Sequence, residues 1–207
     1  VNRVWHWRFG RGLSPSVDNF GLLGLPPTHP ELLDWLTATF VEMGWRFKDL
    51  HKSILMSATW QQSTSHPEAD VYSEKGPAEQ LLWRQRVHRL RAEQLRDTML
   101  AVTGELDTTA GGPSVDTGTP RRALYVKIQR NTPDAMLAAF DVANGLTSTS
   151  QRTSTTTPTQ ALLMINGDYV LGRAKKLGGR MRNSGRETCA GALTHGFRLA
   201  WGRRPSE

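Results

Sequence analysis

The stretch from Thr28 to Gln62, THPELLDWLTATFVEMGWRFKDLHKSILMSATWQQ, contains two runs of helical periodicity separated by Gly44. The apolar face of the first run consists of Leu32, Leu33, Leu36, Phe40 and Met43, and that of the second consists of Phe47, Leu50, Ile54 and Ala58. Spacings of three and four residues bring such side chains onto one side of an α-helix. We therefore predict two helices that form an antiparallel pair, with Trp35, Trp45 and Trp60 completing the seam between them.

The ends of the first helix are also marked in the sequence. Thr28 followed by Glu31 matches a capping box, and Pro30 falls in the first turn, where its missing N–H costs nothing. Gly44 is a suitable stop signal. The same start signals recur at Thr157-Pro158-Thr159-Gln160, which predicts a second capped helix.

Helical patterns continue through most of the chain. Val1, Val4, Trp5 and Phe9, ended by Gly10, predict a short first helix, and Ala92, Leu95, Met99, Val102 and Leu106 predict a longer one. A short helix is expected around Phe140, closed by a turn at Asn144-Gly145. The chain then ends in a helical pair whose inner faces are Val170, Ala174, Leu177 and Met181, and Cys189, Leu193, Phe197 and Ala200, with Ser184 and Glu187 capping the last helix.

The spacing of apolar residues changes once, between residues 123 and 129, from the helical repeat to a repeat of two. Leu124, Val126 and Ile128 alternate with Tyr125, Lys127 and Gln129, which predicts a half-buried strand. A strand needs a partner for its backbone groups, so we expect it to pair with an irregular segment nearby or with chain outside these residues. The expected fold class is mainly α, an irregular multi-helix domain with one short strand or small hairpin.

The 207 residues are long enough for one large or two small domains. Because the chain begins without Met and Gly202–Glu207 resembles the start of another helix, we interpret residues 1–207 as a single helical domain excised from a longer protein. The loop at 108–120, which contains Gly111-Gly112-Pro113, offers a subdivision into a helical half, 1–107, and a strand-plus-helices half, 121–207. The sequence contains no run of eighteen apolar residues, so no transmembrane segment is predicted.

The formal net charge of +7 is concentrated at one end of the chain. Residues 168–207 carry nine Lys and Arg against three acidic residues, whereas the other residues carry 17 against 16. Arg173, Lys176 and Arg180 fall on the outer side of the C-terminal helical pair. We expect these three side chains to form an anion-binding face.

The sequence contains few residues that are typical of metal or nucleophilic sites. The six His residues are at least fifteen residues apart, so no metal-binding helix and no metal site are expected. The single Cys189 excludes a disulfide within the chain, and its helical pattern favours a small buried core residue. There is no Cys-x-x-Cys-His for covalent haem and no Gly-x-Ser-x-Gly nucleophile motif.

The richest polar set near a predicted core is Arg130, Asn131, Asp141, Arg152, Gln160 and Asn166. It has two interpretations. These residues could form a pocket that holds an anionic group between two guanidinium groups, with Asp141 as acid or base. Alternatively, they form a buried Arg–Asp network that fixes the Ser/Thr-rich loop at 147–157, which is favoured because no second carboxylate is placed to complete an acid/base pair.

A second basic set lies between a short helix expected from Ala78 to about Arg86 and the longer helix that begins near Ala92. Arg84, Arg86, Arg89 and Arg91 are interleaved with Trp83 and His88, a composition found in nucleic-acid-binding strips. Glu93 and Asp97 stand one helical turn away and would pair with Arg89 and Arg96. The sequence therefore favours solvated ion pairs here over nucleic-acid binding.

Several short motifs occur in order along nearly the whole chain. They are Asn2-Arg3-Val4-Trp5, Phe9-Gly10-Arg11-Gly12, Phe20-Gly21, Pro27-Thr28-His29-Pro30-Glu31-Leu32-Leu33-Asp34-Trp35-Leu36, Arg96-Asp97, Gly111-Gly112-Pro113-Ser114, Phe140-Asp141, Thr157-Pro158-Thr159-Gln160-Ala161-Leu162 with Asn166, and Gly202-Arg203-Arg204-Pro205. As a set they resemble the planctomycete-type domain of unknown function that lies near the C-terminus of large envelope proteins, behind cytochrome-c-like domains.

This resemblance implies a mainly helical domain in an exported parent protein, located in the periplasm or cell envelope. It implies no cofactor in this segment, with any haem c supplied by a neighbouring cytochrome-like domain, and it brings no catalytic residues. We therefore expect a non-catalytic module that packs against neighbouring domains of its parent and presents a basic face to acidic glycans or envelope polymers. The alternatives are a carbohydrate-active hydrolase that uses Asp141, Arg130 and Arg152, and a nucleic-acid-binding domain.

Overall fold

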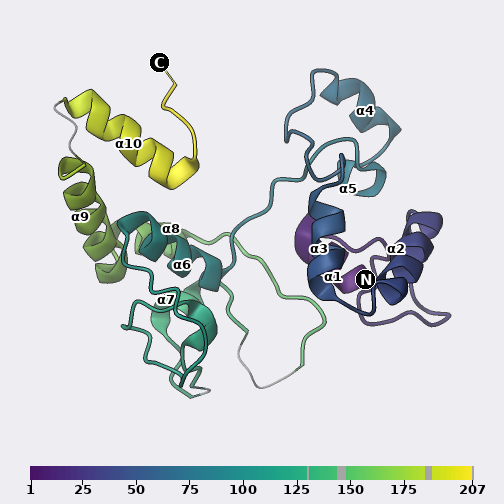
Figure 1. The fold of residues 1–207 in the computed structure, drawn as a ribbon, viewed down its shortest axis with the longest axis horizontal. Coiled ribbons are helices and arrows are strands. Elements are labelled where there is room, and N and C mark those ends of the chain that lie inside the picture. The colour runs from purple at the N-terminus through teal and green to yellow at the C-terminus, as the bar shows by residue number, and fades with distance from the viewer. Residues whose placement is uncertain (130, 144–147, 185–187, 207) are drawn as a thin grey trace. The chain divides into compact units, whose positions relative to one another are not determined.

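The computed structural model describes residues 1–129, 131–143, 148–184 and 188–206 (Figure 1). The chain is mainly α-helical, as the periodicity predicts. It divides into two compact units, Val1–Arg89 and Leu90–Glu207. Among the residues just given, no helix combines the length and the apolar character needed to cross a membrane.

The first unit is built on helices near the N-terminus. Its helices are α1 (Asn2–Phe9), α2 (Pro30–Glu42), α3 (Phe47–Leu55), α4 (Ala69–Lys75) and α5 (Ala78–Leu81). The core joins Trp5 and Phe9 of α1 to Leu36 and Phe40 of α2 and to Leu50 and Ile54 of α3. Residues Leu36 and Ile54 are only 3% and 2% exposed, so the predicted packing of α2 against α3 is confirmed. The predicted first helix, ended by Gly10 in the left-handed conformation, is also confirmed.

The predicted role of the tryptophans is partly wrong. Trp60 packs edge-on against Phe9 at a centroid distance of 5.5 Å, and Trp45, although 65% exposed, packs edge-on against Phe40 at 5.4 Å. Trp35, however, is 57% exposed. Trp35 directly precedes the buried Leu36, and successive residues lie about 100° apart around a helix. Its side chain therefore points away from the face that packs on α3. The second predicted face is also shorter than expected, because Ala58 lies beyond α3. Phe47 is 57% exposed but still contacts the Phe40 ring, at a centroid distance of 5.3 Å.

The predicted capping box at Thr28 is wrong. The residue that precedes α2 is His29, and it forms no side-chain capping bond. Thr28 instead uses both its backbone N–H and its hydroxyl to bond the carbonyl oxygen of Leu13, at 2.9 and 3.3 Å. The start of α2 is thus fixed by a contact with the preceding loop, while Pro30 occupies the first turn as predicted.

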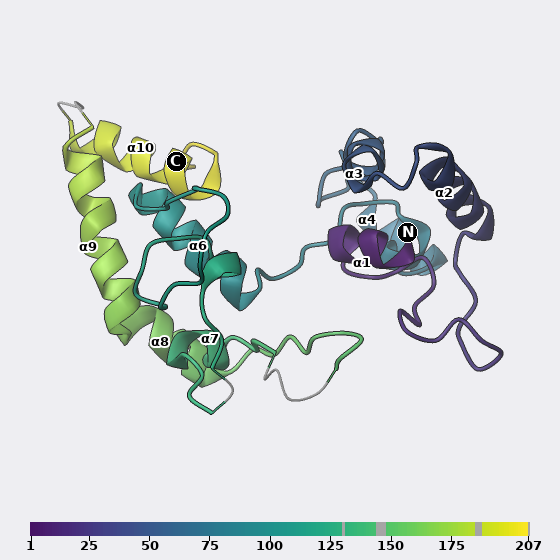
Figure 2. The same ribbon diagram turned by 60° about the horizontal axis from the view of Figure 1, so that its bottom comes forward.

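The second unit places its other helices around α6 and α9. Its elements are α6 (Ala92–Thr103), the 3₁₀ turn η1 (Ala123–Tyr125), α7 (Ala135–Ala139), α8 (Pro158–Asn166), α9 (Asp168–Arg182) and α10 (Cys189–Trp201). Helix α6 packs on α9, α7 and η1, and α9 also contacts α8 and α10 (Figure 2). A core cluster joins Ala92 to Met136, Leu137 and Phe140. The capping box of Thr157 and Gln160 at the start of α8 is confirmed.

The predicted strand at 123–129 is wrong. Residues Ala123–Tyr125 form a 3₁₀ turn, and Leu124 and Ile128, which were expected on the inner face, are 74% and 64% exposed. The extended backbone after the turn makes one isolated parallel bridge, between Val126 and Val115. The bridge is closed by hydrogen bonds from Val115 N to Tyr125 O and from Lys127 N to Val115 O. The expected pairing with an irregular segment therefore exists, but over a single bridge.

Two further expectations differ from the structure. Helix α6 packs on C-terminal helices and belongs to the second unit, whereas the sequence offered a division in the loop at 108–120. Cys189, expected in a core, is exposed because it is the first residue of α10. The residue of α10 that is buried is Gly196, whose Cα approaches the Met181 side chain of α9 so closely that a Cβ would lie 2.7 Å from it. Close approach of the two helices at Gly196 replaces the predicted contact through Leu193, which is 50% exposed.

We expect Leu50→Ala to lower the free energy of unfolding of the first unit by about 3 kcal/mol, because it removes a fully buried side chain and leaves a cavity. Trp35→Ala removes a larger side chain but should change the free energy by about 0.5 kcal/mol or less, since the indole is mostly in water. Urea unfolding followed by circular dichroism compares the two. Equal losses would contradict the assignment of these two faces.

Candidate functional site

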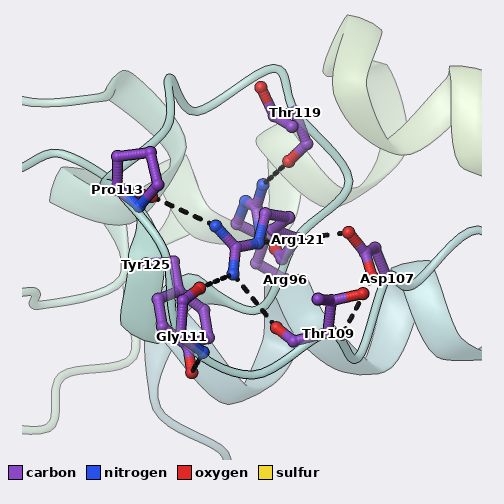
Figure 3. Close-up of polar contacts among 8 residues, drawn as sticks. All are labelled: Arg96, Asp107, Thr109, Gly111, Pro113, Thr119, Arg121 and Tyr125. Carbon is purple, nitrogen blue, oxygen red and sulfur yellow. Dashed lines mark hydrogen bonds and ion pairs between the residues drawn. The ribbon is translucent and has the colours of Figure 1, made fainter.

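Arg121 is the centre of the most extensive polar network in the second unit (Figure 3). Its side chain is buried, and its guanidinium group donates to backbone carbonyl oxygens from three loop residues. Nη1 bonds Pro113 O at 3.1 Å, while Nη2 bonds Thr109 O at 3.0 Å and also Gly111 O. The guanidinium carbon lies 4.1 Å from the centroid of the Tyr125 ring. The Tyr125 hydroxyl in turn accepts from the backbone N–H of Gly111 at 2.9 Å.

Arg96 makes a similar set of contacts from the middle of α6. Only 2% of its surface is exposed. Nη1 donates to Arg121 O at 2.7 Å, and Nη2 donates to Thr117 O at 2.8 Å and to Thr119 O at 2.6 Å. The adjacent Asp97 accepts from Arg96 Nη1 at 3.4 Å and from the backbone N–H of Ala123 at 2.7 Å. Two buried guanidinium groups therefore hold the loop between α6 and η1.

The electrostatics of this network favour a structural role. A buried cation needs compensation, and six carbonyl dipoles together with Asp97 and Asp107 supply it here. Asp107 Oδ2 lies 4.0 Å from Arg121 Nε. Hydrogen bonds from Thr109, with a smaller contribution from the charge of Arg121, lower the pKa of Asp107. Since both guanidinium forks are bonded to backbone, they are not available to hold an external anion.

The structure brings together part of the predicted pocket. Asp141 accepts from both the backbone N–H and the hydroxyl of Thr155, at 2.7 and 2.9 Å. Gln160, only 2% exposed, donates to Ala139 O at 2.8 Å and to the Thr155 hydroxyl at 3.3 Å. Asp141 and Gln160 thus fix the end of the Ser/Thr-rich loop to α7 and α8.

The other predicted pocket residues do not join this cluster. Arg152 binds the carboxylate of Glu93 on α6, with Nη1 at 2.7 and 2.9 Å from its two oxygens. Asn131 and Asn166 are exposed. Arg130 lies outside the described residues, as do Asn144, Gly145 and Glu187, for which a turn and a cap were predicted. The arrangement among the described members resembles the predicted network that fixes the loop, with Arg152 paired to Glu93 in place of Asp141.

The predicted anion-binding residues of α9 face α6. Arg173 and Lys176 both bind the carboxylate of Glu105, which also accepts from the Thr103 hydroxyl at 2.8 Å. Arg180 donates to the backbone carbonyls of Ala101 and Val102 at the C-terminal end of α6, at 3.1 and 2.7 Å. Cations are favourable at that end of a helix because its carbonyls lack intrahelical partners.

Glu105 is the acidic partner at this contact. Burial alone would raise the pKa of Glu105, but hydrogen bonds from Arg173, Lys176 and Thr103 outweigh that effect and hold the pKa at about 2. The carboxylate therefore stays ionised at all but strongly acidic pH. Its two cations, with Arg180, bind α9 to α6.

A basic pocket of about 370 Å³ lies on a different surface, at α10. Gly191, Thr194, His195 and Arg198 are spaced three and four residues apart, so they share one face of the helix. Arg204 and Pro205 of the following segment complete the lining. No carboxylate lines this pocket, and residues 188–206 contain three Arg and no Asp or Glu.

The basic strip at 84–91 has local partners in the first unit. Arg84 donates to Thr64 O at 3.2 Å and lies over the Trp83 ring, with its guanidinium carbon 4.9 Å from the centroid. Arg86 donates to Gly10 O at 3.5 Å. Trp83 itself stacks on Tyr72. Arg84 and Arg86 are therefore engaged in contacts inside the first unit. Of the predicted ion pairs, Arg96–Asp97 is confirmed and Glu93 binds Arg152.

The roles of Arg96 and Arg121 were not predicted from the sequence. Arg96 lies four residues after Ala92 and four before Leu100, and all three are buried on one face of α6. An arginine in phase with buried apolar residues was the available signal. Nothing in the sequence around Arg121 indicated its carbonyl partners. Within the described ranges, no group of three His, Cys, Asp or Glu side chains is placed to hold a metal ion.

Comparison with known families covers the whole chain. Residues 1–207 match the family PSD1, a protein of unknown function (DUF1553), and the chain belongs to this family. No curated protein and no solved structure matches it. The family membership confirms the similarity of the sequence motifs to a domain of unknown function.

We expect Arg121→Lys to destabilise the second unit by about 3 kcal/mol, because an ammonium group cannot bond three separate carbonyls in the fork geometry and leaves some of these partly buried carbonyls without a donor. The neighbouring Arg122 is exposed, so Arg122→Lys is a matched control that should be silent. Thermal unfolding of the two variants tests this. A loss below about 1 kcal/mol for Arg121→Lys would contradict the assigned role.

The Glu105 contact predicts a pH dependence of stability. Its pKa is lower in the folded chain, about 2, than its ordinary value of 4.5, so its contribution is present above pH 4.5 and is lost as the pH falls toward 2. Glu105→Gln should therefore flatten the decline of the unfolding midpoint over that window. Glu42→Gln alters an exposed carboxylate of the first unit and should leave the decline unchanged. If the unfolding midpoint of Glu105→Gln falls over this pH range as much as that of the wild type, ionised Glu105 is not the source of the pH dependence.

Proposed function

We propose that this chain is a non-catalytic helical module that binds acidic glycans or envelope polymers through the basic surface of its C-terminal helices. The observation that supports it is the pocket at α10, lined by His195, Arg198 and Arg204 without a carboxylate. Guanidinium groups hold carboxylate and sulfate oxygens with paired N–H donors, which suits repeated acidic groups along a polymer.

The choice of α10 over α9 follows from the contacts of the basic residues. Arg173, Lys176 and Arg180 are bonded to Glu105 and to α6 carbonyls, so an external anion would have to displace internal partners. Among the described residues, the Arg198 side chain forms no ion pair or hydrogen bond, and it is exposed on α10. Cations without internal partners are the ones that can release counterions when a polyanion binds.

The contacts of Asp141, from the predicted pocket, and of Glu93, the partner of Arg152, support a non-catalytic role. Asp141 is held by two bonds from Thr155, and Glu93 is held by Arg152. Neither carboxylate is poised opposite a second acid in the way that hydrolysis of a glycosidic bond requires. Part of the module's function would then be packing against neighbouring domains of its parent.

The cellular context is a further part of the proposal. By its resemblance the parent protein would be exported to the periplasm or cell envelope, and any haem c would sit in a neighbouring cytochrome-like domain. The chain's single Cys is compatible with this, since covalent haem attachment uses two. Recovery of the native protein in the cytoplasmic fraction of its cell would contradict export.

We expect the double variant Arg198→Ala/Arg204→Ala to elute from a heparin column at lower salt than the wild type. Loss of two ionic contacts should also reduce the slope of log affinity against log salt by about two. Binding to heparin is measured between about 50 and 300 mM NaCl, a range over which added salt progressively screens exposed charges.

The matched control is Lys48→Ala/Lys52→Ala. It removes the same net charge from two exposed lysines of the first unit and should shift elution much less. Equal shifts for the two double variants would show a general charge effect and refute the α10 site. If the wild type is retained on random duplex DNA as strongly as on heparin, and Arg198→Ala/Arg204→Ala loses that retention, the pocket would be assigned to nucleic acid instead.

A further inference from the structure

Three adjacent hollows of the second unit meet at Asp134, the residue that precedes α7. A hollow of about 260 Å³ lies on one side of it, one of about 140 Å³ is next to that, and one of about 230 Å³ lies toward α8 and α9. Asp134 lines all three. The first two also share Lys127 and Gln129, and the last two share Thr117. Because they share these lining residues, the three hollows are neighbours, and we call them together the Asp134 groove.

The walls of the Asp134 groove alternate between apolar and polar. Ile128, Pro133, Leu137 and Val142 line one end. Asp116, Lys127 and Thr132 line the middle. Met136, Leu163 and the Tyr169 side chain line the other end. Ile128 is 64% exposed, so its apolar surface is open to a ligand.

Asp134 has capacity for a further hydrogen bond. One carboxylate oxygen, Oδ1, accepts from the backbone N–H of Leu137 at 3.0 Å and so caps α7. An ionised carboxylate offers about four acceptor sites, and the described contacts of Asp134 use one of them. Oδ2 can therefore accept from a donor brought by a ligand, without loss of the cap.

The charges of the groove select among ligands. Asp116, Asp134 and Asp168 line it, Lys127 is already bonded to Asp116 at 3.4 Å, and Arg96 is bonded to loop carbonyls. An anionic chain would meet uncompensated carboxylates here. A neutral chain that donates hydroxyl hydrogens to them, and that packs apolar C–H faces on Ile128 and Leu163, satisfies both kinds of wall.

We propose that the Asp134 groove binds a neutral oligosaccharide chain, with Asp134 accepting from a sugar hydroxyl and Ile128 packing against a ring. Sugar rings combine hydroxyl donors at their rim with apolar C–H faces, which matches the alternation of the walls. Burial raises the pKa of Tyr169, so its side chain stays neutral beside such a ligand. This site is independent of the acidic-polymer site proposed at α10.

Titration calorimetry of the full chain with cellohexaose, xylohexaose and mannohexaose tests the proposal. At least one should bind with a Kd below about 1 mM. Asp134→Asn should weaken that binding by about tenfold, since it removes a hydrogen bond to a charged acceptor. Asn is as good a helix cap as Asp, so the variant should keep its fold, which circular dichroism checks. Ile128→Ser, at an exposed position, should weaken binding by about threefold.

Asp18→Asn is the matched control, because it neutralises an exposed carboxylate of the first unit. It should bind the sugar as the wild type does. Failure of all three hexaoses to bind would overturn the proposal, and so would equal affinities for the wild type, Asp134→Asn and Ile128→Ser. Binding of the peptide Gly-Ala-Gly-Ala-Gly-Ala in place of the sugars would assign the groove to an extended polypeptide and overturn the carbohydrate class.

Discussion

The second unit depends on hydrogen bonds from two buried guanidinium groups to backbone carbonyls. The chain between α6 and η1 has almost no regular structure, so its carbonyls have no helix or sheet partners of their own. Arg96 and Arg121 supply donors for six of them, and the carbonyl dipoles in turn compensate two charges removed from water. These hydrogen bonds between guanidinium groups and carbonyls therefore hold in place the loop, the adjoining part of α6 and the neighbouring walls of the Asp134 groove.

Helices were predictable where one face is apolar along several turns. Leu36, Phe40, Leu50 and Ile54 face the core because their spacing leaves them no other arrangement that buries all four. The strand at 123–129 was not predictable from alternation alone. Of the three residues expected inward, only Val126 is buried, because Leu124 lies within the 3₁₀ turn at Ala123–Tyr125 and Ile128 lies beyond the single bridge at Val126. Residue propensity could not distinguish a strand from a turn whose first backbone N–H is bonded by Asp97.

The candidate sites show the same limit. Asp141 and Gln160 could be placed together from the sequence because each stands at a helix end. The basic face of α9 could not be judged, because the partner of Lys176 is Glu105, 71 residues earlier in the chain. Arg121 was missed since its partners are carbonyls, which every residue possesses and which no pattern of side chains reveals. The α10 pocket was visible only as a local excess of charge.

The two arginines hold their loop through backbone carbonyls, and this determines which loop positions tolerate a change of residue type. Thr117 and Thr119 are held through their main chain, so their side chains can vary without loosening the loop, whereas the Thr109 side chain also bonds Asp107. Gly111 and Gly112 have φ near +80°, so side chains larger than hydrogen are disfavoured there for reasons of backbone geometry. The loop can therefore present new surface chemistry between fixed anchor points, and relatives that share the same frame could differ in what they recognise there.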